Sequence, residues 1–471
     1  MKRVSNSSRS EALVCGLVAF VGAITLIPSV AAAQDQPWLQ DRRFTQGIGI
    51  RVGDFELHPG AAVDFGYDSN FLHRDDGMNL DEKPIQSLRL RVTPSFSMDT
   101  LGAQRREVTP GASPPTVEFH GAVSATYNEY IPIAGGVNAT DRSNLSQQRN
   151  VGGDLDLKLA ILPQRPWSVN LTGNYLRDLT PSNGALPAEA YTRDIPRAGA
   201  EVVWQPGGGL FDWRLGYNFQ GTFFENSQYQ GLSNLDNQIE TRGRWRFLPR
   251  SALLADARFD FINYPNAAGG TGGLPEKTDS HPLRVQMGYS GLVTPWFSVL
   301  AMAGWGASFY TPKPQDDFDS VIGQAELRFY LTPNPNVTPG QATLSISSLA
   351  FGFQRDFFDN YIGTYGEQDR GYAKLLYFFG GQFLLQVEGG AGPVVYSPAA
   401  NLGAQAAAGF TDVRVDAQIY GEYRIKDVFG IGITGRYTME TSPVTLQVAG
   451  AGADSLAWKD IETYLTLRYV M

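Results

Sequence analysis

Cysteine is almost absent from this sequence, and so are long apolar runs beyond its N-terminal region. Cys15 is the single cysteine among 471 residues, so no disulfide can link two parts of the fold. A helix that crosses a membrane needs about 20 consecutive apolar residues, and no segment after the N-terminal region has them. Any later membrane crossing must therefore use strands. These strands must close into a barrel, because an open sheet edge leaves backbone groups unpaired in lipid.

An excess of positive charge is also absent. The chain has 38 Lys and Arg against 47 Asp and Glu, a formal net charge of −9, which argues against nucleic acid as a partner. Catalytic signatures are scarce: there are four histidines, no HExxH and no GxSxG. His73 and His281, which we place in long loops near aspartates, are the candidates for a catalytic group, but the polarity of solvated loops explains them more simply. We expect no enzyme, no cofactor and no metal site.

The N-terminal region itself has the pattern of a secretory signal peptide. Basic residues precede the apolar run from Ala12 to Ile27, and three consecutive alanines follow it. This pattern predicts a signal peptide over residues 1–33, which would take Cys15 with it when it is removed. The polar stretch 34–53 is interpreted as a periplasmic lead-in, and residues 54–471 as the barrel.

Alternating strands fill the rest of the chain, and the clearest example runs from Val151 to Tyr175. From Val151 to Ile161 apolar residues and glycine occupy the odd positions, while mostly polar residues occupy the even ones. Two prolines then mark a short turn, and the alternation resumes from Trp167 to Tyr175. A period of two is typical of a strand with one apolar and one wet face. Each strand has about ten residues, close to the 9 to 11 that a tilted strand needs to cross a bilayer.

The same unit recurs to the C-terminus, and we count about eighteen strands. Short and long connections alternate, except that residues 99–116 and 333–341 are long where a short turn is expected. A barrel with short periplasmic turns and long external loops produces this alternation. Aromatic residues such as Trp167 and Tyr175 occupy both ends of the apolar face, as in the girdles of outer-membrane barrels. The predicted fold is all-β: a transmembrane antiparallel β-barrel in contact with lipid, in the outer membrane of a Gram-negative bacterium.

The other face of the strands carries the charges. A charged Arg or Lys against lipid at the bilayer midplane costs about 2–4 kcal/mol, so this face should line the lumen. Three arginines, Arg242, Arg244 and Arg246, lie on one strand, and we expect them to face the charged run from Asp256 to Asp260 on the next. Three like charges exceed what local pairing requires, so this ladder is the best candidate for a functional stripe. The alternative is that the charges form cross-strand pairs that only hold the wall together. The predicted lumen-lining residues are Arg89, Arg91, Lys158, Arg214, Arg242, Arg244, Arg246, Asp256, Arg258, Asp260, Arg328, Tyr330, Arg414, Asp416, Tyr420, Arg436, Tyr464 and Arg468.

Three of these residues are tyrosines, Tyr330, Tyr420 and Tyr464. A tyrosine ring in the lumen could stack on a sugar, although a structural role explains each of them more simply. A barrel of about eighteen strands is wide enough to leave a water channel unless a loop fills it.

The stretch from Arg51 to Asp76 carries a resemblance to a known family. It has a short strand entry, a proline within the first strand and then the sequence Gly-Tyr-Asp-Ser-Asn from Gly66 to Asn70. This resembles the opening of the β-barrel porin 2 family, and the repeat of strand, proline-marked turn and strand is similar to that family as far as the C-terminus. The terminal Met471 departs from the aromatic residue that usually ends outer-membrane barrels, while Tyr469 keeps the alternation. We therefore still expect the barrel assembly machinery to recognise the chain.

The resemblance implies a role in the export of surface polysaccharide, through an eighteen-stranded conduit that works with a periplasmic polysaccharide export protein. The leading hypothesis is therefore a passive conduit for an exopolysaccharide. A diffusion porin for small solutes, general or selective, is the alternative. A third hypothesis is a barrel closed by its loops that serves as a structural or adhesive platform.

Overall fold

Strands make up nearly all of the part of the chain that the computed structural model describes. One short 3-10 helix, η1 (Ser227–Leu232), accompanies them. Within the described ranges no helix is long and apolar enough to span a membrane. The described residues are 49–75, 84–101, 116–133, 149–163, 165–181, 190–207, 209–267, 276–311, 317–331, 347–380, 382–399, 406–425, 428–448 and 452–471.

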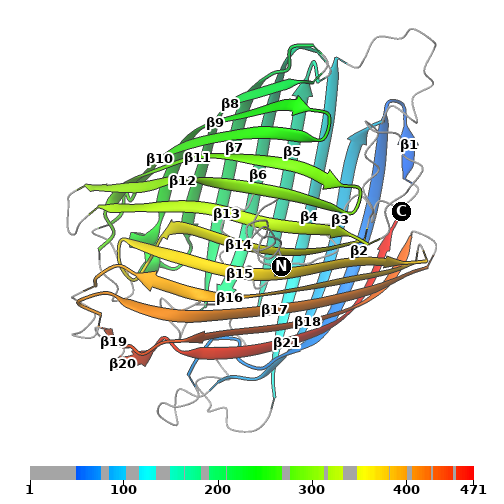
Figure 1. Ribbon diagram of the computed structural model, residues 1–471. Helices are drawn as coiled ribbons and strands as arrows, with labels where there is room; N and C mark the ends of the chain where they lie inside the picture. The colour runs from blue at the N-terminus through cyan, green and yellow to red at the C-terminus, as the bar shows by residue number, and fades with distance from the viewer. Residues whose placement is uncertain are drawn as a thin grey trace, which may run out of the picture.

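Eighteen strands form one closed antiparallel wall, as the sequence predicts (Figure 1). Each strand pairs with its neighbours in chain order, and the last, β21, pairs with both β18 and β2, which closes the ring. The strands of the wall are β2 (Phe55–Asp68), β3 (Ser87–Thr100), β4 (Val117–Pro132), β5 (Asn150–Ile161), β6 (Trp167–Pro181), β7 (Ala190–Trp204), β8 (Phe211–Phe224), β9 (Asn234–Leu248), β10 (Ser251–Asn263), β11 (Asp279–Thr294), β12 (Phe297–Thr311), β13 (Phe318–Tyr330), β14 (Ser348–Asp359), β15 (Tyr365–Phe379), β16 (Phe383–Tyr396), β17 (Phe410–Ile425), β18 (Phe429–Thr441) and β21 (Trp458–Val470).

The seam of the barrel joins the first and last strands of the wall, so the red β21 lies beside the blue β2 in Figure 1. Their register runs from Gly60 opposite Val470 to Asp68 opposite Glu462. Below this register β2 continues past the end of β21 while still paired with β3 on its other side, and the three-residue strand β1 (Ile50–Val52) pairs with it there. The predicted lead-in therefore contains one additional strand. The predicted signal peptide and residues 34–48 of the lead-in lie outside the described residues.

The two faces of the wall have opposite chemistry. Residues paired across neighbouring strands point to the same side, so the register assigns a side to each residue. In β21 burial alternates without error: Glu462, Tyr464 and Arg468 are buried, whereas Ile461 and Leu465 are exposed. Buried charges with exposed apolar residues are the reverse of a soluble sheet. The exposed face therefore contacts lipid, and the charged face is enclosed by the wall.

The connections alternate in length as predicted. The turn between β9 and β10 has two residues, whereas the connection between β8 and β9 contains η1. β1 and the C-terminus lie at one end of the barrel, and the hairpin of β19 (Thr445–Val448) and β20 (Gly452–Ser455) lies at the other (Figure 1). We call these the periplasmic and external ends. The prediction for His281 is wrong: this residue lies in β11, where Phe309 is its cross-strand partner.

Candidate functional site

The structure places all the predicted lumen-lining residues on the enclosed face. Because paired residues share a side, the register carries this assignment around the ring from the buried face of β21. The residues are Arg89, Arg91, Lys158, Arg214, Arg242, Arg244, Arg246, Asp256, Arg258, Asp260, Arg328, Tyr330, Arg414, Asp416, Tyr420, Arg436, Tyr464 and Arg468. They do not form one site: their surroundings divide them into a wetted region around β9 and a buried region at the seam.

The wetted region is the arginine stripe, which we define as Arg214, Arg242, Arg244 and Arg246. The side chains of Arg242 and Arg244 are 38% and 40% exposed, although they point to the enclosed face. Water must therefore fill the lumen beside β8 and β9. Arg246 is also exposed and has no ion pair with any described residue.

Acidic residues of neighbouring strands compensate most of the stripe. Glu201 of β7 binds Arg214 at 3.3 Å and Arg242 at 3.1 Å. Asp212 of β8 binds Arg214 at 3.0 Å and Arg244 at 2.9 Å. These two carboxylates were not among the predicted lumen-lining residues. Each lies at a polar position of its alternating strand, and this pattern could have placed it on the inner face. Its ion-pair partner depends on the register between strands, which alternation alone does not give.

The predicted pairing between the stripe and β10 is largely wrong. Arg242 does lie opposite Asp256, but Arg244 lies opposite Leu254. The other two charges of β10 face polar residues of β9 nearer the external end: Arg258 lies opposite Glu240, and Asp260 lies opposite Gln238. Because the turn between β9 and β10 has only two residues, Arg244 and Arg246 face the residues of β10 next to the turn, and the charged run lies further along the strand.

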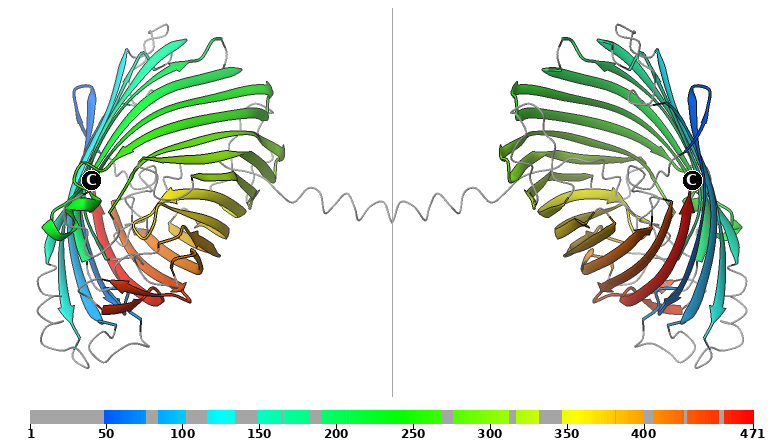
Figure 2. Two further views of the ribbon diagram at one scale, coloured as in Figure 1. Left: turned by 90° about the vertical axis from the view of Figure 1, so that its left-hand side faces the viewer. Right: turned by 90° about the vertical axis from the view of Figure 1, so that its right-hand side faces the viewer.

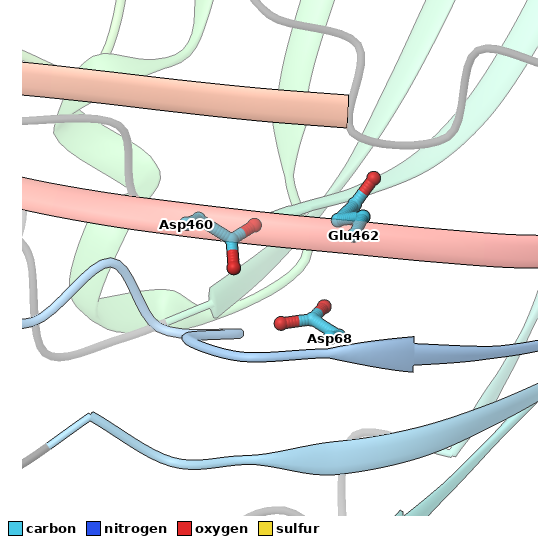
Figure 3. A group of neighbouring side chains, drawn as sticks. All are labelled: Asp68, Asp460 and Glu462. Atoms are coloured by element: carbon cyan, nitrogen blue, oxygen red, sulfur yellow. The ribbon is translucent and has the colours of Figure 1, made fainter. Parts of the chain in front are cut away.

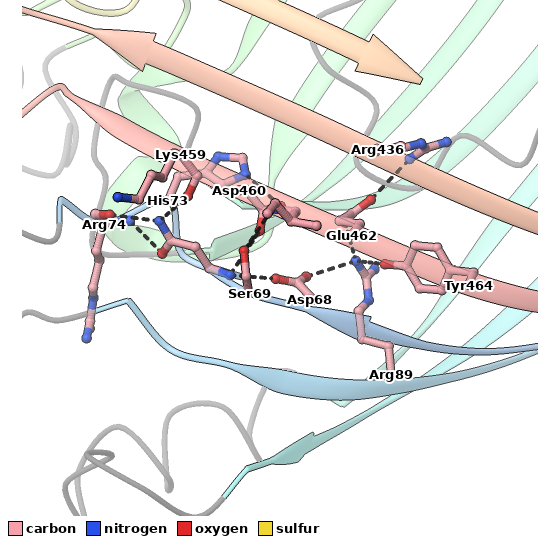
Figure 4. Close-up of polar contacts among 12 residues, drawn as sticks. Asp68, Ser69, His73, Arg74, Arg89, Arg436, Lys459, Asp460, Glu462 and Tyr464 are labelled. Atoms are coloured by element: carbon pink, nitrogen blue, oxygen red, sulfur yellow. Dashed lines mark hydrogen bonds and ion pairs between the residues drawn. The ribbon is translucent and has the colours of Figure 1, made fainter. Parts of the chain in front are cut away.

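The buried region is the seam clamp, which we define as Asp68, Arg89, Asp460, Glu462 and Tyr464 (Figure 4). Arg89 is 2% exposed. Its Nη1 donates to Glu462 Oε1 at 2.9 Å, to Tyr464 Oη at 2.8 Å and to Asp68 Oδ2 at 3.3 Å. Because these residues belong to β2, β3 and β21, the guanidinium links the first strands of the wall to the last one.

Three carboxylates of the clamp have the composition of a metal centre. Their oxygens lie within 4.8 Å of one another at Asp68, Asp460 and Glu462 (Figure 3). Arg89 already binds the first and the third. An oxygen of Asp460 accepts hydrogen bonds from Ser69 Oγ at 2.8 Å and from the Asn70 backbone N–H at 2.9 Å. The ligand positions are therefore used by protein donors, and the group acts as a structural clamp.

The first external loop folds onto this clamp. The Asn70 side chain donates to the Lys459 carbonyl at 2.9 Å and to the Arg74 carbonyl at 2.7 Å, and it accepts from the Arg74 N–H. His73 then stacks on Trp458, with ring centroids 3.9 Å apart. The loop therefore covers part of the inner wall beside β21, which keeps the clamp out of water.

The three predicted tyrosines are buried and used by the protein itself. Tyr330 Oη bonds Ser298 Oγ at 3.0 Å, Tyr464 accepts from Arg89, and Tyr420 donates to Glu422. With their rings buried, they do not offer a face to a passing sugar. This supports the structural role.

Most of the other predicted charges have a partner on their own strand or one or two strands away. The pairs between strands fit the alternative that cross-strand pairs hold the wall together. The pairs are Arg91 with Asp64, Lys158 with Asp156, Arg258 with Asp260, Arg328 with Glu326, Arg414 with Glu440, Asp416 with Arg370, Arg436 with Glu462, and Arg468 with Glu422.

At the external end, loops and strand ends from distant parts of the wall meet in one buried apolar cluster. Phe224, at the end of β8, lies edge-on to Tyr361 of the loop after β14, with ring centroids 6.1 Å apart. The strands β8 and β14, which end at or just before these two residues, are six strands apart in the ring. At about 4.8 Å per strand, this is about 29 Å along the sheet. The loops must therefore cross the mouth rather than follow its rim. This external loop cluster consists of Phe224, Tyr229, Leu232, Ile362, Val394, Tyr396, Ala399, Ala406, Phe410, Val444 and Leu456.

A buried lysine makes a second link between loops. Lys277, which precedes β11, donates to the Asp359 carboxylate at 3.3 Å and to the Gly363 carbonyl at 3.2 Å. Tyr264, after β10, also donates to Asp359. Burial and the adjacent carboxylate raise the pKa of the Tyr264 hydroxyl, so it remains a donor. Figure 2 shows the curved wall whose external end these loops link.

The closed wall, its lipid-facing apolar side and its wetted inner charges define a transmembrane β-barrel of the outer-membrane type. Neither a family model nor a curated protein matches the chain, so the resemblance to the β-barrel porin 2 family stays a prediction.

Several solved structures are similar to this chain, among them the outer membrane protein OpdK. OpdK of Pseudomonas aeruginosa has a TM-score of 0.44 and 10% identity, over 89% of this chain and 99% of that one. OccAB2 of Acinetobacter baumannii has a TM-score of 0.47 and 11% identity, over 89% and 98%. OprD of Pseudomonas aeruginosa has a TM-score of 0.41 and 11% identity, over 91% and 97%.

Proposed function

We propose that this barrel is a passive diffusion channel for small hydrophilic solutes, and not an enzyme. The contact between Phe224 and Tyr361 across the mouth is the observation that carries the proposal. Loops that cross the mouth narrow the opening, so that small molecules pass and large ones are excluded. The exposed arginines of β9 supply a hydrated inner wall along which a polar solute can move.

Charges of both signs line the wetted region. Glu201 and Asp212 neutralise most of the stripe, while Arg246 adds a cation without a partner among the described residues. A mixed lining suits a weakly selective passage better than a filter for one ion. We therefore expect permeation of neutral and charged solutes, with a modest preference for anions.

The polysaccharide conduit that the resemblance implies requires a mouth wide enough for a polymer and a lining that lets sugar rings slide. The external loop cluster narrows the mouth, and the buried tyrosines offer no stacking surface. Both observations favour the small-solute channel. An export protein in the periplasm is not required by this proposal.

Liposome swelling tests the proposal. We expect purified barrel in vesicles to admit monosaccharides and small ions and to exclude oligosaccharides beyond a sharp size limit. Passage of a dextran polymer through the wild-type barrel would overturn the proposal and restore the conduit. Deleting the gene should leave surface polysaccharide unchanged.

A further inference from the structure

A pair of buried carboxyl groups lies next to the external loop cluster, and only one cationic side chain among the described residues is close enough to balance their charge. Asp412 of β17 is 0% exposed, and Glu440 of β18 is 1% exposed. Both point to the enclosed face, since Arg414 pairs in register with Glu440. The titratable groups that face the pair from the described elements around it are Tyr396 of β16 and Arg414 of β17.

The two neighbours both serve Glu440. Tyr396 Oη donates to Glu440 Oε1 at 2.7 Å, and Arg414 donates to Glu440 Oε2 from Nη2 at 2.6 Å and from Nε at 3.1 Å. Asp412 lies against Glu440 and Ser442, yet neither of its oxygens accepts a hydrogen bond of ordinary geometry from a described residue. One guanidinium therefore faces two buried carboxyl groups. A buried carboxylate without donors is strongly unfavourable, so one of the two must be neutral.

We propose that Asp412 holds a proton at neutral pH and donates it to Glu440, and that this carboxyl–carboxylate pair holds the external loop cluster together. With a proton on Asp412, the pair carries a single negative charge, which the Arg414 guanidinium balances. Glu440 is the suitable acceptor, because its Oε1 accepts only from Tyr396 and keeps a second lone pair, whereas Oε2 already accepts two hydrogen bonds from Arg414.

The position of the pair couples it to the loops. Val394, the register partner of Asp412 on β16, is a fully buried member of the external loop cluster. Tyr396 stacks on Phe410 at 4.6 Å, two residues before Asp412. The last loop begins just after Glu440, where Ser442 Oγ accepts from the N–H of Val444, another member of the cluster.

Loss of the proton would place two negative charges side by side in a dry site. Repulsion would then separate β17 from the start of the last loop and draw Val444 out of the cluster. Low pH therefore keeps the mouth narrow, and rising pH widens it. We call the Asp412–Glu440 pair the latch. Because it releases one proton, it can change the ratio of closed to open mouths by at most about tenfold per pH unit.

Two measurements on the full-length barrel in lipid test the latch, and they are separable. Infrared difference spectroscopy reports the proton and needs no transport: we expect a protonated-carboxyl band at neutral pH that disappears in Asp412→Asn. Bilayer conductance reports the mouth, and this arm rests on the proposed channel function. We expect wild-type conductance to rise several-fold between about pH 5 and about pH 9.

Asp412→Asn should remain at the low conductance at every pH, because its amide can donate to Glu440 as the protonated carboxyl does. The matched control is Asp319→Asn, which changes an exposed aspartate of β13 outside the pair. The conductance of this variant should change with pH as that of the wild type does. If Asp412→Asn does not fold, Glu440→Gln removes the same charge conflict and should also lose the band and the pH response.

Absence of the carboxyl band, or its survival in Asp412→Asn, would overturn the shared proton. A wild-type band with a conductance that does not change with pH would overturn the latch while leaving the channel intact. A barrel that conducts at no pH would overturn both the channel and the latch, and the band would still decide whether the proton is shared.

Discussion

Arginines on two parts of the same inner wall have opposite surroundings. Arg89, on β3 at the seam, is buried and donates to two carboxylates and two tyrosines. Arg242, six strands away on β9, is exposed to the lumen water, binds Glu240 and shares Glu201 with Arg214. Both residues occupy the same kind of position in an alternating strand. The strand pattern determines only which face a charge is on, and the loops determine whether that charge is wet.

The comparison predicts that the two regions differ most in stability. Replacing a buried cation leaves its carboxylates uncompensated, and breaking such a pair costs about 3–5 kcal/mol. Arg89→Met should therefore lower the free energy of unfolding by about this amount, because Asp68 loses the guanidinium and Glu462 keeps only the longer ion pair with Arg436 at 3.5 Å. Urea unfolding of the barrel in lipid vesicles measures the difference.

Arg246→Met is the matched control for this change. The residue is also an inward arginine, but it is exposed and has no ion pair with a described residue. Substitutions at such positions usually change stability by less than about 0.5 kcal/mol. If the two variants lost the same stability, the division of the wall into a buried and a wetted region would be wrong.

The next largest effect should come from the external loop cluster. Removing a buried aromatic side chain leaves a cavity and costs about 3–5 kcal/mol in a core, although loops that can relax lose less. Phe224→Ala removes the ring that contacts Tyr361 across the mouth. We expect the size limit for sugars in liposome swelling to rise, with little change in unfolding of the wall.

Phe219→Ala provides the control for that experiment. It removes the same kind of ring from the same strand, but Phe219 is on the lipid-facing side, opposite Ala198. Its loss should leave the size limit unchanged. An unchanged limit in Phe224→Ala as well would show that the cluster does not restrict the mouth.

The sequence was sufficient for the wall. Alternation, strand length and the lengths of the connections predicted the closed antiparallel barrel and the facing of each inward charge, because these depend on local period and on the exclusion of charge from lipid. The residues from Val151 to Tyr175 show this well, since the predicted hairpin is the observed β5 and β6.

The contacts could not be predicted in the same way. Asp256 and Asp260 were expected to face the stripe, but the two-residue β9–β10 turn sets a register in which only Asp256 lies opposite one of its arginines. Glu201 and Asp212 supply the compensating charge instead. The loop cluster and the clamp bring together residues more than a hundred positions apart, and a single sequence has no local signal for such contacts.

The smallest predicted effect concerns the wetted side alone. Arg246 lies near the periplasmic end of β9, and its charge is compensated by no described acidic residue. Because lumen water and salt screen an exposed charge over about 8 Å at physiological ionic strength, its influence on passing ions is weak. Arg246→Gln should lower the ratio of anion to cation permeability by about twofold, which corresponds to about 0.4 kcal/mol. Reversal potentials in a salt gradient measure the ratio. Arg89→Lys, which keeps the buried charge at the seam, should leave it unchanged; an equal shift in both variants would mean that the seam, too, is open to the permeating ions.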